Sequence, residues 1–589
     1  MKEFLKMTTA SIIGMLIAGF LLIILGITTL TGMMLSTEME TVVKNNSVFV
    51  LDLKGNIVER YTENPLDQIM GEDITTYGLD DILSAIEKVK NDDRIKGIFI
   101  NAENFGCGTA SLQEIRNAII DFKESEKFVV AYSGAYTQGA YYISSVADKV
   151  FLNPSGSISW HGLAGQTMFL KDLLAKVGVK MQIFRVGTYK SAVEPFIATE
   201  MSPANREQTM AYIQSIWDKI TEDVAESRNI SVEELNTLAD KNMDFQPAEV
   251  YIDNGMADKL MYKDEVLSYL KTLTDISEDD KLATLTLSDM KNVKALSATE
   301  KSSDVIAVYY ASGEIDNMTS NSYDDGINSE KVIKHLRDLR NDKKVKAVVL
   351  RVNSPGGSAY GSEQIWREVE LLKSAKPVVV SMGDYAASGG YYISCAANWI
   401  VAQPTTLTGS IGIFGMIPDA SELITDKLGV KFDVVKTNRL SDMGNMGRAL
   451  NNEEGALIQN MVNNGYELFT KRCAEGRNIP IDELKKIAEG RVWSGVMAKD
   501  IKLVDELGGL DCAIKKAAEL SGVEGYKLAS YPKKIDFVTS IISNAKPERY
   551  ISSKLENSFG EFYGCFNMIQ NIEKVERIQA RVPFEISIN

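Results

Sequence analysis

The chain of 589 residues is poor in the side chains that most hydrolytic and metal sites use. It contains only two histidines, so there is little choice for a histidine base. Its five cysteines show no C-x-x-C spacing and therefore give no metal or redox motif, and we expect them to be free thiols. The formal net charge is −16 without a long basic tract, which argues against nucleic acid as a partner. A peptide substrate is more consistent with this charge than a nucleic acid is.

Charged residues are also missing between Lys6 and Glu38. This apolar run is longer than the roughly 7–15 residues of a cleavable signal and long enough for the roughly 20 residues of a membrane span. We therefore predict a cytoplasmic N-terminus over residues 1–9 and a transmembrane anchor over residues 10–36. Lysines precede the run and acidic residues follow it, so the positive-inside rule places the rest of the chain on the outer, periplasmic side.

The chain repeats itself at an offset of 250 residues. "NDDRIKGIFI" begins at Asn91 and "NDKKVKAVVL" at Asn341, and "YTQGAYYIS" returns as "YAASGGYYIS". In both copies short apolar strands alternate with helical periods, which predicts an α/β fold with a parallel sheet in each half. We predict the N-terminal repeat over residues 45–273 and the C-terminal repeat over 304–525. A polar linker over 274–303 joins them, and the extension 526–589 remains unassigned.

Ser388 is the candidate nucleophile. In "KPVVVSMGDYAASGGYYIS" an apolar strand enters a turn of small residues and continues as a helix, which places Ser388 at a helix N-terminus. The amide of Gly389 is free there to stabilise an oxyanion. The alternative is that Ser388 only caps the helix. The first half has Gln138 at the matching position and therefore lacks this nucleophile.

A second glycine turn follows another strand in "RVNSPGGSAYGS". Its two glycines, Gly356 and Gly357, stand at the carboxyl end of a strand, where parallel α/β folds place their sites. One of their amides is the candidate for a second oxyanion donor, with a simple turn as the alternative. The first half has Cys107 at the position of Gly357.

Neither histidine is well placed to act as the base. His335 lies in the charged helical run "SEKVIKHLRDLR", and His161 lies in the half without the serine. Because no histidine is suitable, a buried lysine with a lowered pKa is the simplest alternative base. The string from Ser543 to Lys546 has S-x-x-K spacing but no glycine turn nearby, so we discount it.

Lys190, in "FRVGTYKSAVEPF", is the better candidate for the base. On its own it would be interpreted as a surface lysine in a polar loop. Under the offset of 250, however, Lys190 matches Leu440, just as Gln138 matches Ser388. Each half has therefore lost the catalytic group that the other kept, which predicts one active site divided between the halves.

Together these motifs resemble the long, tandem-domain form of signal peptide peptidase A, or protease IV, a family of membrane-anchored serine peptidases with a Ser–Lys dyad. The similarity covers nearly the whole chain and includes "RVNSPGGS", "TLTGSIGIFG" and "GTYKSAVEPF". It implies two tandem Clp-protease/crotonase-like α/β domains after an N-terminal transmembrane helix. It also implies Ser388 as nucleophile, Lys190 as base and Ser410 as the residue that orients the lysine. Gly389 and Gly357 would form the oxyanion hole.

The resemblance further implies a homotetramer on the periplasmic side of the bacterial inner membrane that degrades cleaved signal peptides without metal or cofactor. Two other functions stay open at this point. A crotonase-type acyl-CoA enzyme shares the fold and the glycine turns but needs neither anchor nor nucleophile. A non-catalytic membrane scaffold would bind peptides without requiring the three polar residues of the site.

Overall fold

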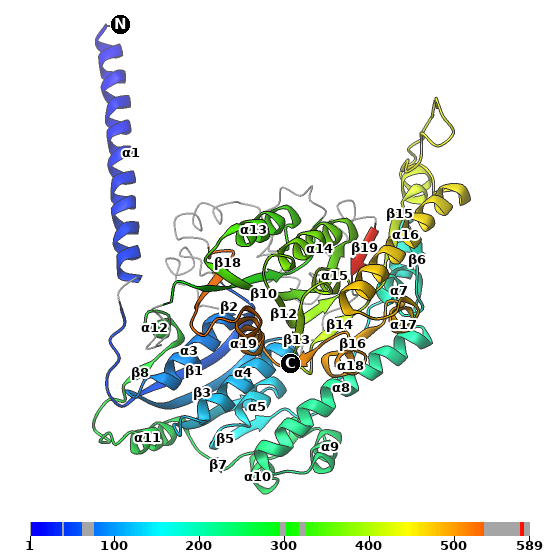
Figure 1. Cartoon of the computed structure of the whole chain (residues 1–589). Coiled ribbons are helices and arrows are strands. Elements are labelled where there is room, and N and C mark those ends of the chain that lie inside the picture. The colour runs from blue at the N-terminus through cyan, green and yellow to red at the C-terminus, as the bar shows by residue number, and fades with distance from the viewer. Residues whose placement is uncertain are drawn as a thin grey trace.

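The computed structural model describes residues 2–37, 40–61, 76–294, 302–316, 326–534 and 578–581. Figure 1 shows helix α1 (Lys2–Thr37) standing apart from a body of two α/β units. The predicted anchor over residues 10–36 falls within α1, whose side chains at 22–24 and 27–37 lie outside the described set. Among the described residues, no helix has both the length and the apolar character needed to cross a bilayer.

The first unit is built on a seven-stranded parallel sheet in the order β2-β1-β3-β4-β5-β7, with β8 also paired to β1. Its strands are β1 (Ser47–Val58), β2 (Thr76–Gly78), β3 (Ile95–Gly106), β4 (Phe128–Tyr136), β5 (Lys149–Ile158), β7 (Lys259–Leu260) and β8 (Thr284–Leu285). Its helices are α3 (Leu79–Asn91), α4 (Thr109–Lys123), α5 (Gln138–Ser144), α8 (Pro203–Arg228), α9 (Val232–Asp240), α10 (Ala248–Asp253), α11 (Lys263–Leu273) and α12 (Leu287–Lys291), with a 3-10 turn η2 (Met243–Phe245).

The predicted linker over 274–303 contains regular structure in its first part. Strand β8 adds to the sheet beside β1, and the Lys88 side chain in α3 donates to the Met290 carbonyl of α12 at 2.7 Å. Residues 295–301 lie outside the described residues. The polar composition of this stretch hid β8, because an edge strand of two residues is held by backbone hydrogen bonds and needs no apolar pattern.

The second unit repeats this arrangement with an eight-stranded sheet in the order β16-β14-β12-β10-β9-β18, and β13 pairs with β12 and β17. All of its pairs are parallel except β14 with β16. The strands are β9 (Val305–Ser312), β10 (Val345–Ser354), β12 (Val378–Ala387), β13 (Trp399–Ala402), β14 (Leu407–Gly409), β16 (Val492–Ser494), β17 (Glu506–Leu507) and β18 (Lys527–Tyr531). The helices are α13 (Ser329–Asn341), α14 (Ala359–Lys373), α15 (Gly389–Ser394), α16 (Asn452–Arg477), α17 (Ile481–Ile487), α18 (Gly495–Asp500) and α19 (Leu510–Ser521).

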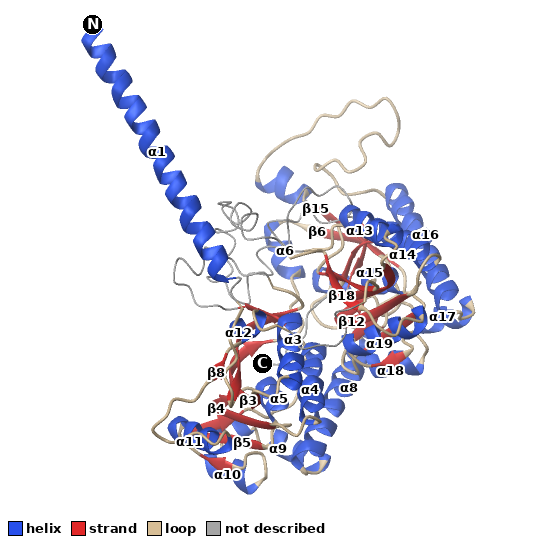
Figure 2. Ribbon diagram, turned by 60° about the vertical axis from the view of Figure 1, so that its left-hand side comes forward, coloured by secondary structure: helices blue, strands red, loops and turns tan. Residues whose placement is uncertain are grey.

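The apolar runs behind these predictions form the centre of each sheet. Val348 to Leu350 in β10 and Val378 to Val380 in β12 are buried, as two-sided burial of a parallel sheet requires. Helix α13 buries Val332, Leu336 and Leu339, one stripe at helical spacing. Figure 2 shows helices covering the strands in both units. The predicted α/β fold with a parallel sheet in each half is confirmed.

A third sheet joins segments that are far apart in the chain. It has the order β11-β19-β15-β6, and its strands are β11 (Gly356–Ser358), β19 (Ile578–Arg581), β15 (Phe414–Asp419) and β6 (Lys180–Arg185). Strand β6 belongs to the first half of the sequence but pairs antiparallel with β15 of the second. Helix α6 (Lys171–Val177) precedes β6, and the short turns η1 (Ser191–Val193) and α7 (Glu194–Ile197) follow it. The first half thus extends residues 171–197 toward the second unit.

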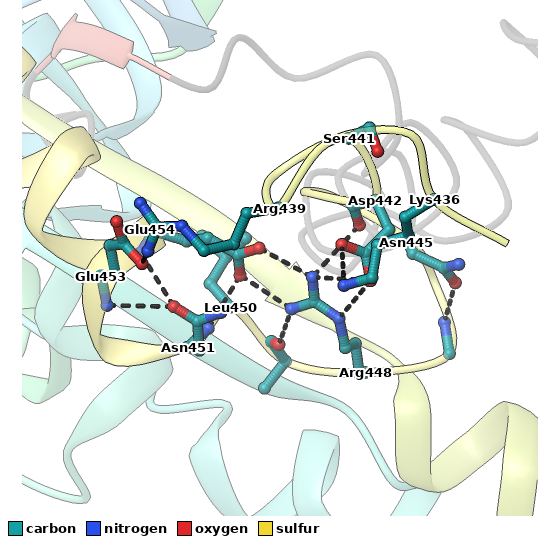
Figure 3. A network of polar contacts seen from close by, with 12 residues as sticks. Lys436, Arg439, Ser441, Asp442, Asn445, Arg448, Leu450, Asn451, Glu453 and Glu454 are labelled. Carbon is teal, nitrogen blue, oxygen red and sulfur yellow. Dashed lines mark hydrogen bonds and ion pairs between the residues drawn. The ribbon is translucent and has the colours of Figure 1, made fainter. Parts of the chain in front are cut away.

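A segment between β15 and α16 projects upward from the body in Figure 1, as α1 does, but from the opposite edge of the body. It begins with a π-helical turn η4 (Glu422–Lys427) and is held by a polar network around Arg448 (Figure 3). Arg448 donates to the carboxylates of Asp442 at 3.1 Å and Glu454 at 2.7 Å. The Gln182 side chain of β6 accepts from the Leu450 amide at 2.8 Å and donates to its carbonyl at 3.0 Å. The base of the segment is therefore fixed to the third sheet.

Candidate active site

Ser388 stands at the junction of β12 and α15 in a strained conformation. Its φ is 57° and its ψ is −112°, a region that non-glycine residues rarely occupy. It is the N-cap residue of α15, yet its side chain makes no capping hydrogen bond. Backbone bonds hold the turn, because the Ser388 amide donates to Gly409 O and the Tyr392 amide donates to Ser388 O, each at 2.8 Å. The hydroxyl is thereby turned away from the capping role and left available for chemistry.

Lys190 comes from the first half and reaches the same point. Its Nζ lies 2.8 Å from Ser388 Oγ and donates to Ser410 Oγ at 3.0 Å and to Ser410 O at 3.1 Å. The side chain is 1% exposed, and burial lowers the pKa of Lys190 from 10.5 to about 7. At neutral pH a large fraction of the amine is therefore neutral and able to accept a proton.

Two glycines of the second half, Gly412 and Gly490, leave room for the Lys190 side chain. A Cβ on Gly490 would lie 2.7 Å from Lys190 Cβ, and one on Gly412 would lie 3.3 Å from Lys190 Cδ. The neighbouring Tyr189 amide donates to Glu489 O at 3.0 Å. The loop that carries Lys190 is thus pressed directly against the backbone of the second unit, and this contact excludes water from the amine.

Ser410 sits behind the amine and is itself fixed. Its φ is 49°, its amide donates to Arg491 O at 2.7 Å and its hydroxyl donates to Gly490 O at 3.3 Å. With the hydroxyl proton committed to Gly490 O, the oxygen is left to accept from Lys190 Nζ. This geometry directs the amine toward Ser388.

Two backbone amides are placed to form an oxyanion hole. The Gly389 amide begins α15 immediately after Ser388, and N–H groups of a first helical turn have no partner within the helix. On the other side, Ile315 donates to Gly356 O at 2.9 Å and accepts from the Ser358 amide at 2.8 Å. Backbone groups alternate along an extended strand, so the Gly357 amide points away from Ile315 and toward the site. A Cβ on Gly356 would lie 2.9 Å from the Gly389 nitrogen, so these two glycine segments are adjacent.

The matching position in the first half is filled. Gln138 is buried, and its Oε1 accepts from the amides of His161 and Gly162, each at 3.1 Å. Trp160, which matches Ser410, is fully buried, donates from Nε1 to Leu235 O at 2.9 Å and packs against a second tryptophan of α8. The replacement side chains therefore fill the space that a second active site would need, and their own polar groups are hydrogen-bonded.

The structure places the histidines in other contacts. His335 Nδ1 lies 3.1 Å from the Tyr309 hydroxyl, and His161 is an exposed residue of the first unit. The string from Ser543 to Lys546 lies outside the described residues. Within those residues, no group of three or more His, Cys, Asp and Glu side chains could hold a metal ion. Cys107, Cys395, Cys473 and Cys512 are free, while Cys565 lies outside the described residues.

Arg351 ties the two halves together close to the site. It lies in β10, five residues before Gly356, and is 1% exposed. Its guanidinium donates twice to Glu59 at 2.9 Å and twice to Glu114, at 2.8 and 2.9 Å, and both carboxylates belong to the first half. Nearby, Asp384 of β12 accepts from the amide and hydroxyl of Ser111 at the start of α4.

Sequence reasoning missed this contact between the halves. The available signal was an arginine that directly follows the apolar run "AVVL", since a buried charge needs partners. The sequence does not show which carboxylates pair with it.

The profile of peptidase family S49 matches residues 121–277 and 370–524, together more than half of the chain. The chain belongs to this family. It is therefore a serine peptidase, and neither an acyl-CoA enzyme nor a non-catalytic scaffold. The Clp protease profile matches residues 297–405, which include the candidate nucleophile and the glycine turn.

Two of the relatives described here cover most of the chain, and a third covers part of it. "Protease 4" of Salmonella typhi is 38% identical over 83% of this chain and 81% of its own length. "Serine protease SPPA, chloroplastic" of Arabidopsis thaliana is 32% identical over 82% of this chain and 70% of its own. "Putative signal peptide peptidase SppA" of Enterococcus faecium is 33% identical over 40% of this chain and 65% of its own.

Among solved structures, a point mutant of ClpP1 from Listeria monocytogenes is 16% identical and covers 35% of this chain and 94% of its own, with a TM-score of 0.24. That score is too low to carry an argument.

Proposed function

We propose that the chain is a membrane-anchored endopeptidase that degrades cleaved signal peptides and other exported peptides through a dyad of Ser388 and Lys190. The observation that carries the proposal is the 2.8 Å separation of Lys190 Nζ and Ser388 Oγ in a pocket that burial keeps dry. A nucleophile in hydrogen-bond contact with a base that is neutral near pH 7 is what serine acylation requires.

The mechanism uses one proton that moves through Lys190. The neutral amine takes the Ser388 proton as Oγ attacks the scissile carbonyl carbon, and the amides of Gly389 and Gly357 donate to the resulting oxyanion. Collapse of the intermediate breaks the C–N bond, and protonated Lys190 returns the proton to the leaving amine. Water then attacks the acyl-enzyme with Lys190 again as base. A Ser388 ester is thus formed and hydrolysed in each cycle.

The anchor and the outer location of the body are parts of the same proposal. Helix α1 exposes large apolar side chains such as Ile13, Leu16 and Phe20, and lysines precede its apolar stretch. Added protease should therefore digest the body in spheroplasts of the source cell and leave only the anchor region. Protection of the body would show that the orientation is wrong.

The substrate class rests on compartment and on the name carried by the Enterococcus relative. The test uses purified full-length enzyme in detergent, with a synthetic signal peptide and a charged, water-soluble peptide of equal length as substrates. We expect the signal peptide to be cleaved with the higher kcat/KM and Ser388→Ala to cleave neither. Equal or lower kcat/KM for the signal peptide would contradict the substrate class while leaving the peptidase intact.

A homotetramer is proposed as the assembly. The segment that projects between β15 and α16 exposes Phe432, Val434 and Val435, the last 98% exposed, and apolar patches of this kind mark contact surfaces. Sedimentation equilibrium of the detergent-solubilised enzyme should give four chains per particle. A monomeric mass would contradict this part of the proposal.

A further inference from the structure

Strand β19, from the otherwise unassigned C-terminal extension, lies in the middle of the candidate active site. It is inserted between β11 and β15 and is antiparallel to both. On one side Ala580 pairs with Gly357, and on the other Gln579 pairs with Phe414. An extended segment of the chain therefore forms backbone pairs with the same glycine strand that supplies an oxyanion donor.

The register brings a carbonyl of β19 to the oxyanion donors. Because Ile315 uses Gly356 O and the Ser358 amide, the Gly357 amide faces β19 opposite Ala580. The Ala580 carbonyl oxygen would lie 1.9 Å from a Cβ on Gly356 and 3.2 Å from one on Gly389. The first contact leaves no room for a side chain at position 356, and the second places this carbonyl close to Gly389, the residue that follows Ser388.

This is the placement that the carbonyl of a scissile bond needs. A peptide that adds as a strand to an exposed edge gains affinity from the main chain, and pockets for its side chains give specificity. By this register Ala580 occupies the position of the residue on the acyl side of the attacked bond, and Arg581 occupies the first position on the leaving side. The Ala580 side chain is fully buried, so this subsite is matched to a small residue.

Glu314 faces the first position on the leaving side. Its two carboxylate oxygens each lie 3.3 Å from Arg581 Nη1, and both side chains are partly exposed. The residue that follows Glu314 is Ile315, whose backbone is bonded on both sides of Gly357. The carboxylate is therefore anchored to the oxyanion strand itself rather than carried on an independent loop.

We propose that β19 lies along the path of peptide substrates and that Glu314 is a specificity residue that selects a basic side chain directly after the scissile bond. The inference rests on the proposed dyad, because the register is read relative to Ser388. A substrate must displace β19 from its place between β11 and β15 before it can bind. Strand β19 is therefore an internal ligand that competes with peptide substrates.

The test measures a ratio in the full-length enzyme. Two peptides are compared that share a small residue before the cleaved bond and differ only in Arg or Glu directly after it. We expect wild type to prefer Arg by about threefold to tenfold in kcat/KM, since a partly exposed ion pair contributes little more and the like charge opposes binding. Glu314→Gln should remove most of the preference and Glu314→Arg should reverse it.

The matched control is Glu249→Arg, which makes the same charge change on an exposed residue of α10 in the first unit and should leave the ratio as in wild type. Competition by β19 lowers kcat/KM for the Arg peptide and for the Glu peptide by the same factor, so it does not change the ratio of the two values. A wild-type ratio near one, or a preference for Arg that survives in Glu314→Arg, overturns the assignment of Glu314. Absence of turnover with both peptides in wild type would instead contradict the dyad.

Occupation of the path is tested separately with Arg581→Glu. Loss of the pair with Glu314 should raise kcat/KM for both peptides by about twofold to fivefold with kcat unchanged, because less of the enzyme is blocked. The charge swap Glu314→Arg with Arg581→Glu should re-form the pair and return kcat/KM toward the wild-type value, measured with a third peptide that carries a neutral residue directly after the cleaved bond. An unchanged KM in Arg581→Glu would show that β19 does not occupy the path in solution.

Discussion

Removing the Arg351 side chain tests how the two halves are held in register. In Arg351→Met the guanidinium is replaced by an apolar chain of similar reach, and Glu59 and Glu114 lose four hydrogen bonds between them. Both carboxylates are at least 95% buried. Burial already raises the pKa of Glu59 although Arg351 opposes this rise. The variant would therefore leave the carboxylates of Glu59 and Glu114 buried between the halves without a cation to pair with.

The magnitude follows from that arrangement. Breaking a buried ion pair by removing one partner costs about 3–5 kcal/mol, and a cation shared by two carboxylates belongs at the upper end of this range. The loss should also depend on pH. Without Arg351 the pKa of Glu59 lies still further above 4.5, so the destabilisation should be small at acidic pH and grow as pH rises through the raised value.

Urea titration of the full-length protein followed by tryptophan fluorescence measures the effect. The control is Arg351→Met combined with Glu59→Gln and Glu114→Gln, in which neutral amides should recover about half of the lost free energy of unfolding. A loss below about 1 kcal/mol in Arg351→Met, or a triple variant no more stable than the single one, would show that the buried ion pairs do not hold the two halves together.

Four further predictions concern the dyad and Ser410, the residue that orients its lysine. Ser388→Ala should abolish peptide hydrolysis with an unchanged urea midpoint, and retention of most activity would exclude Ser388 as nucleophile. The kcat/KM of wild type should rise with pH around the lysine pKa of about 7 and reach roughly 1% of its plateau two pH units below it; a profile flat across this range would contradict a lysine base. Lys190→Arg should be as inactive as Lys190→Ala, because a guanidinium group cannot lose its proton. Ser410→Ala should lower kcat about tenfold because one hydrogen bond to the lysine is lost, and an unchanged kcat would contradict the orienting role of Ser410.

The repeat made the candidate site predictable from sequence. Gln138 and Leu440 stand where the other copy has Ser388 and Lys190, so the offset, combined with the lack of a suitable histidine, predicted the division of the dyad. The structure brings the two catalytic candidates within 2.8 Å of one another. Local patterns sufficed for this step because each residue sits in a recognisable turn or loop within its own half.

The contacts between distant segments could not be predicted. Strand β6 pairs with β15 of the other half, and β19 enters the site from the extension, and short strands such as these carry no distinctive periodicity. The partners of Arg351 lie 292 and 237 residues away. Such pairings depend on how the two units are placed in space, which composition and spacing within one segment do not encode.

Acylation of Ser388 by a fluorophosphonate requires the nucleophile and its lysine base at once, so this single reaction reports on both halves of the divided site. We expect wild type to be labelled at Ser388 alone, at a rate that rises about a hundredfold between about pH 5 and the plateau with a midpoint near 7. Lys190→Met should not be labelled above background although Ser388 is intact. Labelling of Lys190→Met at the wild-type rate would show that the base lies elsewhere and that the site is not divided between the halves.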